Sequence, residues 1–130
     1  MTILLLLLAP ILPLLLADNQ CNPADIDIIT KRDSFGEFAY DCGFRSLGSG
    51  RRTAKCVMEG CGVSEGCAHC YGTFTKCGRG CAMQCVIGGN PATPACQKCM
   101  DKTPCVDALS KCTGISELPP PPSRRNHQCN

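Results

Sequence analysis

The chain opens on an apolar run and continues as a mixed sequence in which apolar positions recur with two different periods. Residues 1–17 carry no charged side chain, and the run from Ile3 to Leu16 is almost entirely Leu, Ile, Ala and Pro. This run is shorter than the roughly 20 apolar residues that cross a bilayer, and its prolines would interrupt a spanning helix. We therefore predict a cleavable signal peptide over residues 1–17, and hence a secreted, extracellular protein. The alternatives are a buried apolar strand and a retained membrane anchor.

A period of two follows in the first part of the remaining chain. Apolar and polar residues alternate over 25–28 and again over 38–44, as they do in strands that have one buried face. The pattern predicts a β-hairpin over about 25–45, whose aromatic face packs on the rest of the domain and whose Asp25 and Asp27 are solvated. Residues 46–52 are predicted to form a flexible connector.

Spacings of three and four residues replace the alternation between about 53 and 114. Steps of this size place side chains on one stripe of a helix. The stripe contains Cys67, Cys70, Phe74, Cys77, Cys81 and Cys85. The helix is expected to end at Gly88-Gly89, and the Thr-Pro pairs at 93–94 and 103–104 are expected to start two shorter helices.

These helices are predicted to fold back on one another as antiparallel neighbours joined by a ladder of disulfides. The predicted pairs are Cys85–Cys96 and Cys81–Cys99. The last helix would then run toward Cys77 and Cys70. The predicted fold is a small disulfide-rich α+β domain over residues 18–116, in which the N-terminal β-hairpin packs on a disulfide-laddered helical hairpin or three-helix block.

The cysteine content determines how such a domain is held together. Fourteen cysteines and only six aromatic residues, none of them Trp, are typical of a secreted scaffold that uses disulfides in place of a large core. We expect all of them to be bonded: Cys21, Cys42, Cys56, Cys61, Cys67, Cys70, Cys77, Cys81, Cys85, Cys96, Cys99, Cys105, Cys112 and Cys129. Eleven lie between Cys56 and Cys112. Because eleven is odd, at least one of these must bond a cysteine outside that block.

The C-terminal residues 117–130 differ in composition from the domain. Four consecutive prolines (119–122) favour an extended polyproline helix, and we predict a proline-rich, solvated tail rather than a recognition ligand. Its Cys129 must either fold back or bond another chain. A Cys21–Cys129 bond is the first prediction, and a disulfide-linked dimer through Cys129 is the alternative.

The charge of the chain limits the classes of partner that we expect. Thirteen Lys and Arg side chains stand against eleven Asp and Glu side chains, which gives a formal net charge of +2. Nucleic acid is therefore not expected as a partner. The chain has no second apolar run after Leu16, so stable membrane insertion is not expected either. The expected partner is an unidentified extracellular protein or surface.

The most specific candidate for chemistry is the segment Cys67-Ala68-His69-Cys70. It resembles the active-site motif of thiol–disulfide oxidoreductases, in which a histidine and a helix N-terminus stabilise the nucleophilic thiolate. Structural disulfides are the favoured interpretation, because many other cysteines surround the pair and no βαβ pattern is present. A zinc site with Cys96 and Cys99 would require thiols that stay reduced. We therefore expect no catalytic residue, no metal and no cofactor.

The side of the long helix opposite the cysteine stripe is the candidate binding surface. It carries His69, Lys76, Arg79 and Met83. The sequence thus predicts a secreted, cysteine-rich protein without enzymatic activity that acts as an extracellular binding or structural module. The alternatives are a defence or toxin-like secreted peptide, which the low net charge disfavours, and, least favoured, the oxidoreductase.

Overall fold

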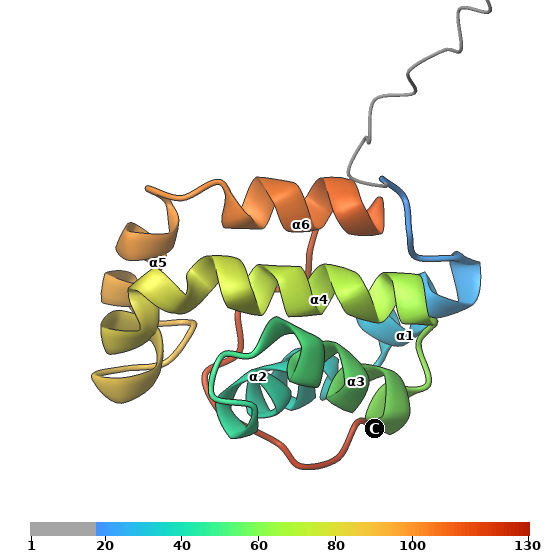
Figure 1. The fold of residues 1–130 in the computed structure, drawn as a ribbon, viewed down its shortest axis with the longest axis horizontal. Helices are drawn as coiled ribbons and strands as arrows, with labels where there is room; N and C mark the ends of the chain where they lie inside the picture. Colours follow the sequence, from blue (N-terminus) through green and yellow to red (C-terminus); the bar gives the residue numbers. More distant parts are fainter. Residues whose placement is uncertain (1–17) are drawn as a thin grey trace, which may run out of the picture.

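The computed structural model describes residues 18–130, so the predicted signal peptide lies outside the described residues. Within this range the chain forms six α-helices, a 3-10 segment and a π-helical segment, and no β-strand. Figure 1 shows α4 through the middle of the molecule, with α6 along one side and α2 and α3 on the other. The elements are α1 (Pro23–Lys31), α2 (Phe35–Arg45), α3 (Gly50–Cys61), α4 (Glu65–Cys77), η1 (Gly78–Cys81), η2 (Met83–Ile87), α5 (Pro94–Met100) and α6 (Cys105–Thr113).

The N-terminal segment is helical, so the predicted α+β fold with a β-hairpin over about 25–45 is wrong. Asn22 caps α1: its side-chain oxygen accepts a hydrogen bond from the Asp25 N–H, and the Asp25 carboxylate accepts one from the Asn22 N–H. Pro23 stands in the first turn, where a missing N–H removes no helical hydrogen bond. This capping box outweighs the short alternation that suggested a strand.

The second half of the expected hairpin is α2, which buries its residues at helical spacing. Phe35, Phe38 and Cys42 face the core, whereas Phe44, expected on the same face as Phe38, is exposed. The expected flexible connector is also ordered. It is a tight turn followed by the first turn of α3, where the Ser49 hydroxyl accepts a hydrogen bond from the Arg52 N–H.

The predicted long helix changes its winding along its length. α4 starts after the N-cap Ser64 and ends at Cys77, and the chain then tightens into η1 and widens into η2 before Gly88. α5 begins at the predicted cap Thr93, and α6 ends at Gly114 in a left-handed conformation, which glycine adopts without strain.

All fourteen cysteines of the described chain are bonded to one another. The bonds are Cys21–Cys67, Cys42–Cys56, Cys61–Cys129, Cys70–Cys112, Cys77–Cys105, Cys81–Cys99 and Cys85–Cys96. The two predicted pairs, at the α5 end of the molecule, are present. Two further bonds join α4 to α6, and these helices run in opposite directions (Figure 1). The remaining three bonds connect the N-terminal segment and the tail to α3 and α4, whereas the odd count required at least one such bond.

The buried side chains form two clusters. The larger one gathers apolar side chains from α1 to α4 and α6, among them Ile29, Phe35, Val57 and Tyr71. The smaller one, around α5 and η2, consists of Met100 and the four cysteines Cys81, Cys85, Cys96 and Cys105. With so little other apolar material, this end of the molecule depends on its disulfides for stability.

The proline-rich tail lies on the body of the protein and is not the free, solvated segment that its composition suggests. After α6 the chain crosses to the α2 side and ends beside α3 (Figure 1). Cys129 is bonded to Cys61 at the end of α3, and three hydrogen bonds join Ser34 and Asn130. Cys129 is therefore bonded neither to Cys21, as predicted, nor to a second chain.

Candidate functional site

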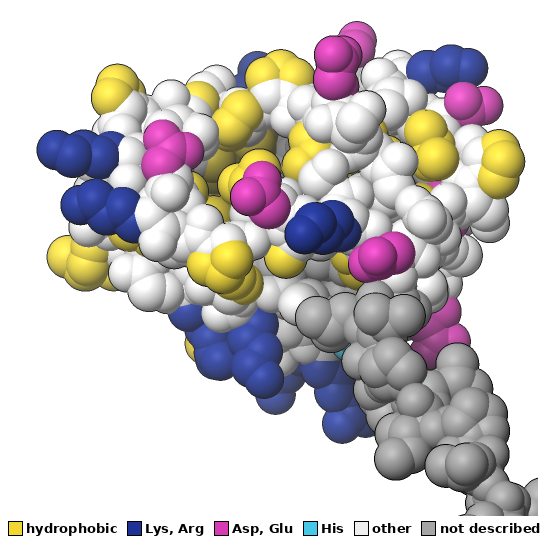
Figure 2. All heavy atoms as spheres, turned by 90° about the horizontal axis from the view of Figure 1, so that it is seen from above, with side chains coloured by type: hydrophobic (Ala, Val, Ile, Leu, Met, Phe, Trp, Pro, Cys, Tyr) yellow, Lys and Arg dark blue, Asp and Glu magenta, His cyan; other side chains and the backbone are white. Residues whose placement is uncertain are grey.

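Four exposed cations lie on the segments that come together where the start of α3 contacts the end of α4. Arg51 and Arg52 lie in the first turn of α3, Lys76 in the last turn of α4, and Arg79 just beyond it in η1. All four are exposed, and we call them the basic patch. Figure 2, which looks onto the molecule from the α6 side, shows Lys and Arg side chains gathered along the lower edge of the view.

Two glycines bring the helices of the basic patch into direct backbone contact. A Cβ atom on Gly72 would lie 2.3 Å from the carbonyl oxygen of Gly50, and one on Gly50 would lie 2.8 Å from the carbonyl oxygen of Gly72. Only residues without a side chain permit this approach. The Gly50 Cβ position is also 3.4 Å from the Lys76 Cβ, so the contact sets Lys76 beside the start of α3.

Arg79 is held against the turn that precedes α3. A Cβ atom on Gly48 would lie 2.9 Å from the Arg79 Cδ and 3.0 Å from its Cγ, so the Arg79 stem lies on the Gly48 backbone. The preceding residue, Leu47, has a positive φ of 53° and an 87% exposed side chain. The apex of this turn is therefore apolar and is bordered by a cation.

The positive charges of the basic patch are not paired with acidic side chains among the described residues. None of its four side chains is within 4.0 Å of a carboxylate, whereas Lys31, Arg45, Lys55, Arg124 and Arg125 each have an acidic partner. The first turn of α3 contains no acidic residue, although acids are favoured and cations disfavoured at the positive end of a helix dipole. An anion bound here would offset both effects.

The four residues of the predicted binding surface do not all lie together in the structure. Lys76 and Arg79 lie together in the basic patch, and His69 is exposed two turns earlier on the same side of α4. Met83 lies beyond the end of α4, in η2, with 63% of its surface exposed. Arg51 and Arg52 were not expected in this surface, because residues 46–52 were predicted to form a flexible connector.

The Cys67-Ala-His-Cys70 segment does not form a redox pair in this structure. Cys67 is bonded to Cys21 and Cys70 to Cys112, so the two sulfurs belong to different disulfides. Both residues are buried, with 0% and 1% of their surface exposed. The proposed zinc ligands Cys96 and Cys99 are likewise bonded to separate partners, so none of the four is a thiolate.

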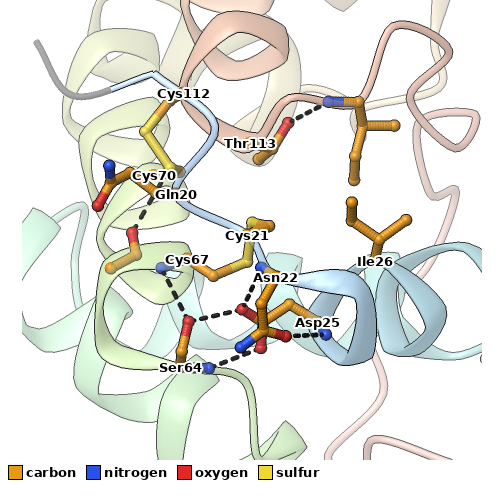
Figure 3. Close-up of a disulfide and its surroundings, with 12 residues drawn as sticks. Gln20, Cys21, Asn22, Asp25, Ile26, Ser64, Cys67, Cys70, Cys112 and Thr113 are labelled. Carbon is orange, nitrogen blue, oxygen red and sulfur yellow. Dashed lines mark hydrogen bonds between the residues drawn. A yellow bond between two sulfur atoms is a disulfide. The ribbon is translucent and has the colours of Figure 1, made fainter.

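Asp25, expected to be solvated, is a buried carboxylate that joins the starts of two helices (Figure 3). It accepts hydrogen bonds from the Ser64 N–H at 2.8 Å and the Ser64 hydroxyl at 2.6 Å, besides the one from Asn22. Burial is the largest influence on the pKa of Asp25 and raises it, but these hydrogen bonds outweigh burial and hold the pKa below its usual value. The sulfurs of Cys21 and Cys67 lie within 4.8 Å of this carboxylate. They are bonded to each other, so the three residues do not make a metal site.

A second buried carboxylate, Asp41 on α2, receives the basic residues of the tail. Its oxygens lie 2.6 Å from Arg45 Nε, 3.4 Å from an Arg125 guanidinium nitrogen and 2.9 Å from His127 Nδ1. Arg125 also stacks over the Phe44 ring, 3.7 Å from its centroid. Arg124 forms an ion pair with Glu37. These contacts fix the tail but leave no carboxylate oxygen of Asp41 exposed.

A surface depression of about 710 Å³ lies where the tail crosses α2 and α3. Its lining includes Glu59 and His127, which could act as acid and base in principle. Both cysteines in its lining, Cys56 and Cys129, are bonded and supply no nucleophile.

Comparisons of this chain with family models, with curated proteins and with solved structures find no match. Among the described residues, no helix combines the length and apolar character needed to cross a bilayer.

Proposed function

We propose that this protein is a secreted module without enzymatic activity, which binds an acidic extracellular molecule through the basic patch. The observation that carries the proposal is the close placement of Arg51, Arg52, Lys76 and Arg79 without acidic partners among the described residues. A formal net charge of only +2 over the chain makes this local concentration of cations more informative than the total.

The disulfides support the proposal because they fix the two helices that carry the basic patch. α3 is bonded at Cys56 to α2 and at Cys61 to the tail. α4 is bonded at Cys70 and Cys77 to α6. A patch held in place before binding loses little conformational entropy when it binds, which suits a small recognition module.

A charge-neutralising pair of variants tests the proposal. The disulfide-intact protein, purified from the medium of a eukaryotic host, is applied to immobilised heparin, a sulfated polysaccharide used as a general polyanion. We expect K76Q/R79Q to elute at clearly lower salt than the unmodified protein, because fewer counterions are released on binding.

The matched control removes two cations elsewhere. Lys98 and Lys102 are exposed near α5, and neither forms an ion pair among the described residues. K98Q/K102Q has the same net charge as K76Q/R79Q but keeps the basic patch. Equal elution of the two double variants would show that only total charge matters, and the proposal would then be abandoned.

A further inference from the structure

We infer that the basic patch and Leu47 together form a docking surface for an anionic phospholipid membrane. The inference rests on the proposed function, since it names the partner of the same patch. It describes peripheral, reversible binding at the headgroup level and no spanning segment.

Leu47 is the feature that favours a membrane over other acidic partners. Its backbone is left-handed, a conformation that is unfavourable for a leucine. Its side chain is 87% exposed and so gains nothing from burial in the free protein. A sulfated polysaccharide offers no apolar phase to receive such a side chain, whereas the boundary between headgroups and acyl chains does.

The cations stand where headgroup phosphates would meet them. Arg79 lies against Gly48, directly after Leu47, and Arg51 and Arg52 follow within the next turn of chain. Lys76 adjoins Gly50. An apolar apex bordered by Arg79, with further cations on the adjoining segments, matches the layering of an anionic bilayer, with apolar chains below and negative headgroups above.

Phe44 extends the apolar apex toward the tail. It is 42% exposed, the Leu47 N–H donates a hydrogen bond to its carbonyl, and the Arg125 guanidinium covers its ring. The Arg125 charge is already paired with Asp41, so Phe44 adds partly exposed apolar surface near Leu47 without adding an unpaired cation.

Sedimentation with vesicles tests the inference. The disulfide-intact protein is mixed with vesicles of phosphatidylcholine alone or of phosphatidylcholine with phosphatidylserine. We expect binding to the anionic vesicles, loss of binding at high salt, and no release of an entrapped dye. K76Q/R79Q should bind about 25-fold more weakly, since each cation near an anionic surface contributes about fivefold.

The variant L47S provides the decisive comparison. It should bind the anionic vesicles about tenfold more weakly, because a buried leucine contributes at least that factor. Its elution from heparin should be unchanged, because no cation is removed. The variant V106S, which alters a 44% exposed apolar residue of α6, serves as the matched control and should bind vesicles normally.

The outcomes separate this inference from the proposed function. If K76Q/R79Q weakens heparin binding but the protein ignores anionic vesicles, or if L47S binds vesicles normally, the membrane inference is overturned and the proposed function stands. If neither heparin nor vesicles depend on the basic patch, both are overturned. Release of the dye would overturn peripheral docking in favour of a toxin-like peptide.

Discussion

The Asp41 carboxylate on α2 lies 2.9 Å from Nδ1 of His127, 86 positions further along the chain. Asp41 is completely buried, whereas the His127 side chain is 77% exposed. The tail is thus held by a buried carboxylate in the body of the protein. Arg125 of the tail and Arg45 of α2 also contact this carboxylate. The relationship explains why a sequence rich in proline and polar residues is ordered here.

Replacing Asp41 with asparagine should loosen the tail. The partners of Asp41 are partly exposed and can return to water, so we expect a loss of about 1–2 kcal/mol in the free energy of unfolding. Hydrogen exchange at the backbone amides of Asn126 and Gln128 should accelerate in D41N. The control is D107N, at an exposed position of α6. Unchanged exchange in D41N would mean that the disulfide alone orders the tail.

The disulfide between Cys61 and Cys129 should protect the dibasic pair Arg124-Arg125 from proteolysis. In the intact protein these side chains are held by Glu37 and Asp41, and the bond keeps the tail in place. We expect trypsin to cleave after Arg125 much faster in C61A/C129A than in the unmodified protein, as followed by mass spectrometry.

A matched disulfide variant separates local from global effects of the lost bond. C85A/C96A opens a bond at the far end of the molecule, around α5, and should leave cleavage after Arg125 slow. Equal acceleration in both variants would indicate general unfolding rather than release of the tail.

The contact between α3 and α4 should not tolerate a methyl group. G72A places a Cβ atom 2.3 Å from the Gly50 carbonyl oxygen, and such overpacking costs about 1–3 kcal/mol. We expect a corresponding fall in melting temperature and weaker heparin binding, because the basic patch is displaced. G80A, where a Cβ atom meets nothing within 4 Å, should be neutral or slightly stabilising. Similar melting temperatures for the two variants would argue against the close contact.

Asp25 should make stability depend on acidic pH. Its pKa lies below the usual value of 3.8 in the folded protein, so the folded state favours the carboxylate. The resulting stabilisation is fully present above about pH 4 and is lost as the pH falls through the lower folded pKa. D25N should therefore be less stable than the unmodified protein near neutral pH, and the difference should shrink below about pH 4.

Thermal unfolding of both proteins between neutral and strongly acidic pH checks this expectation for Asp25. D27N is the matched control, because Asp27 is exposed and forms only a surface ion pair with Lys31. A D25N deficit that is as large in strong acid as at neutral pH would show that the Asp25 charge is not responsible.

The helical part of the fold was largely predictable because helix signals are local. Cysteines at steps of three and four, the cap at Thr93 and the stop near Gly88 each act within one or two turns of chain. They were sufficient to predict Cys81–Cys99 and Cys85–Cys96, whose partners are separated by 18 and 11 positions. The capping box at Asn22 and Asp25 is an equally local signal, but the short alternation over the same residues suggested a strand.

What the sequence by itself determined is the covalent and local character of this protein: a cysteine-rich chain with helical spacing over its central part. Only the tertiary structure decided that Cys129 bonds Cys61, that Asp41 holds the tail, and that Gly50 at the start of α3 lies beside Lys76. The physical reason is that these contacts join residues far apart in the chain. Cysteine bonds with any cysteine that the fold brings near, and exposed charges have no periodicity, so no pattern along the chain specifies their partners.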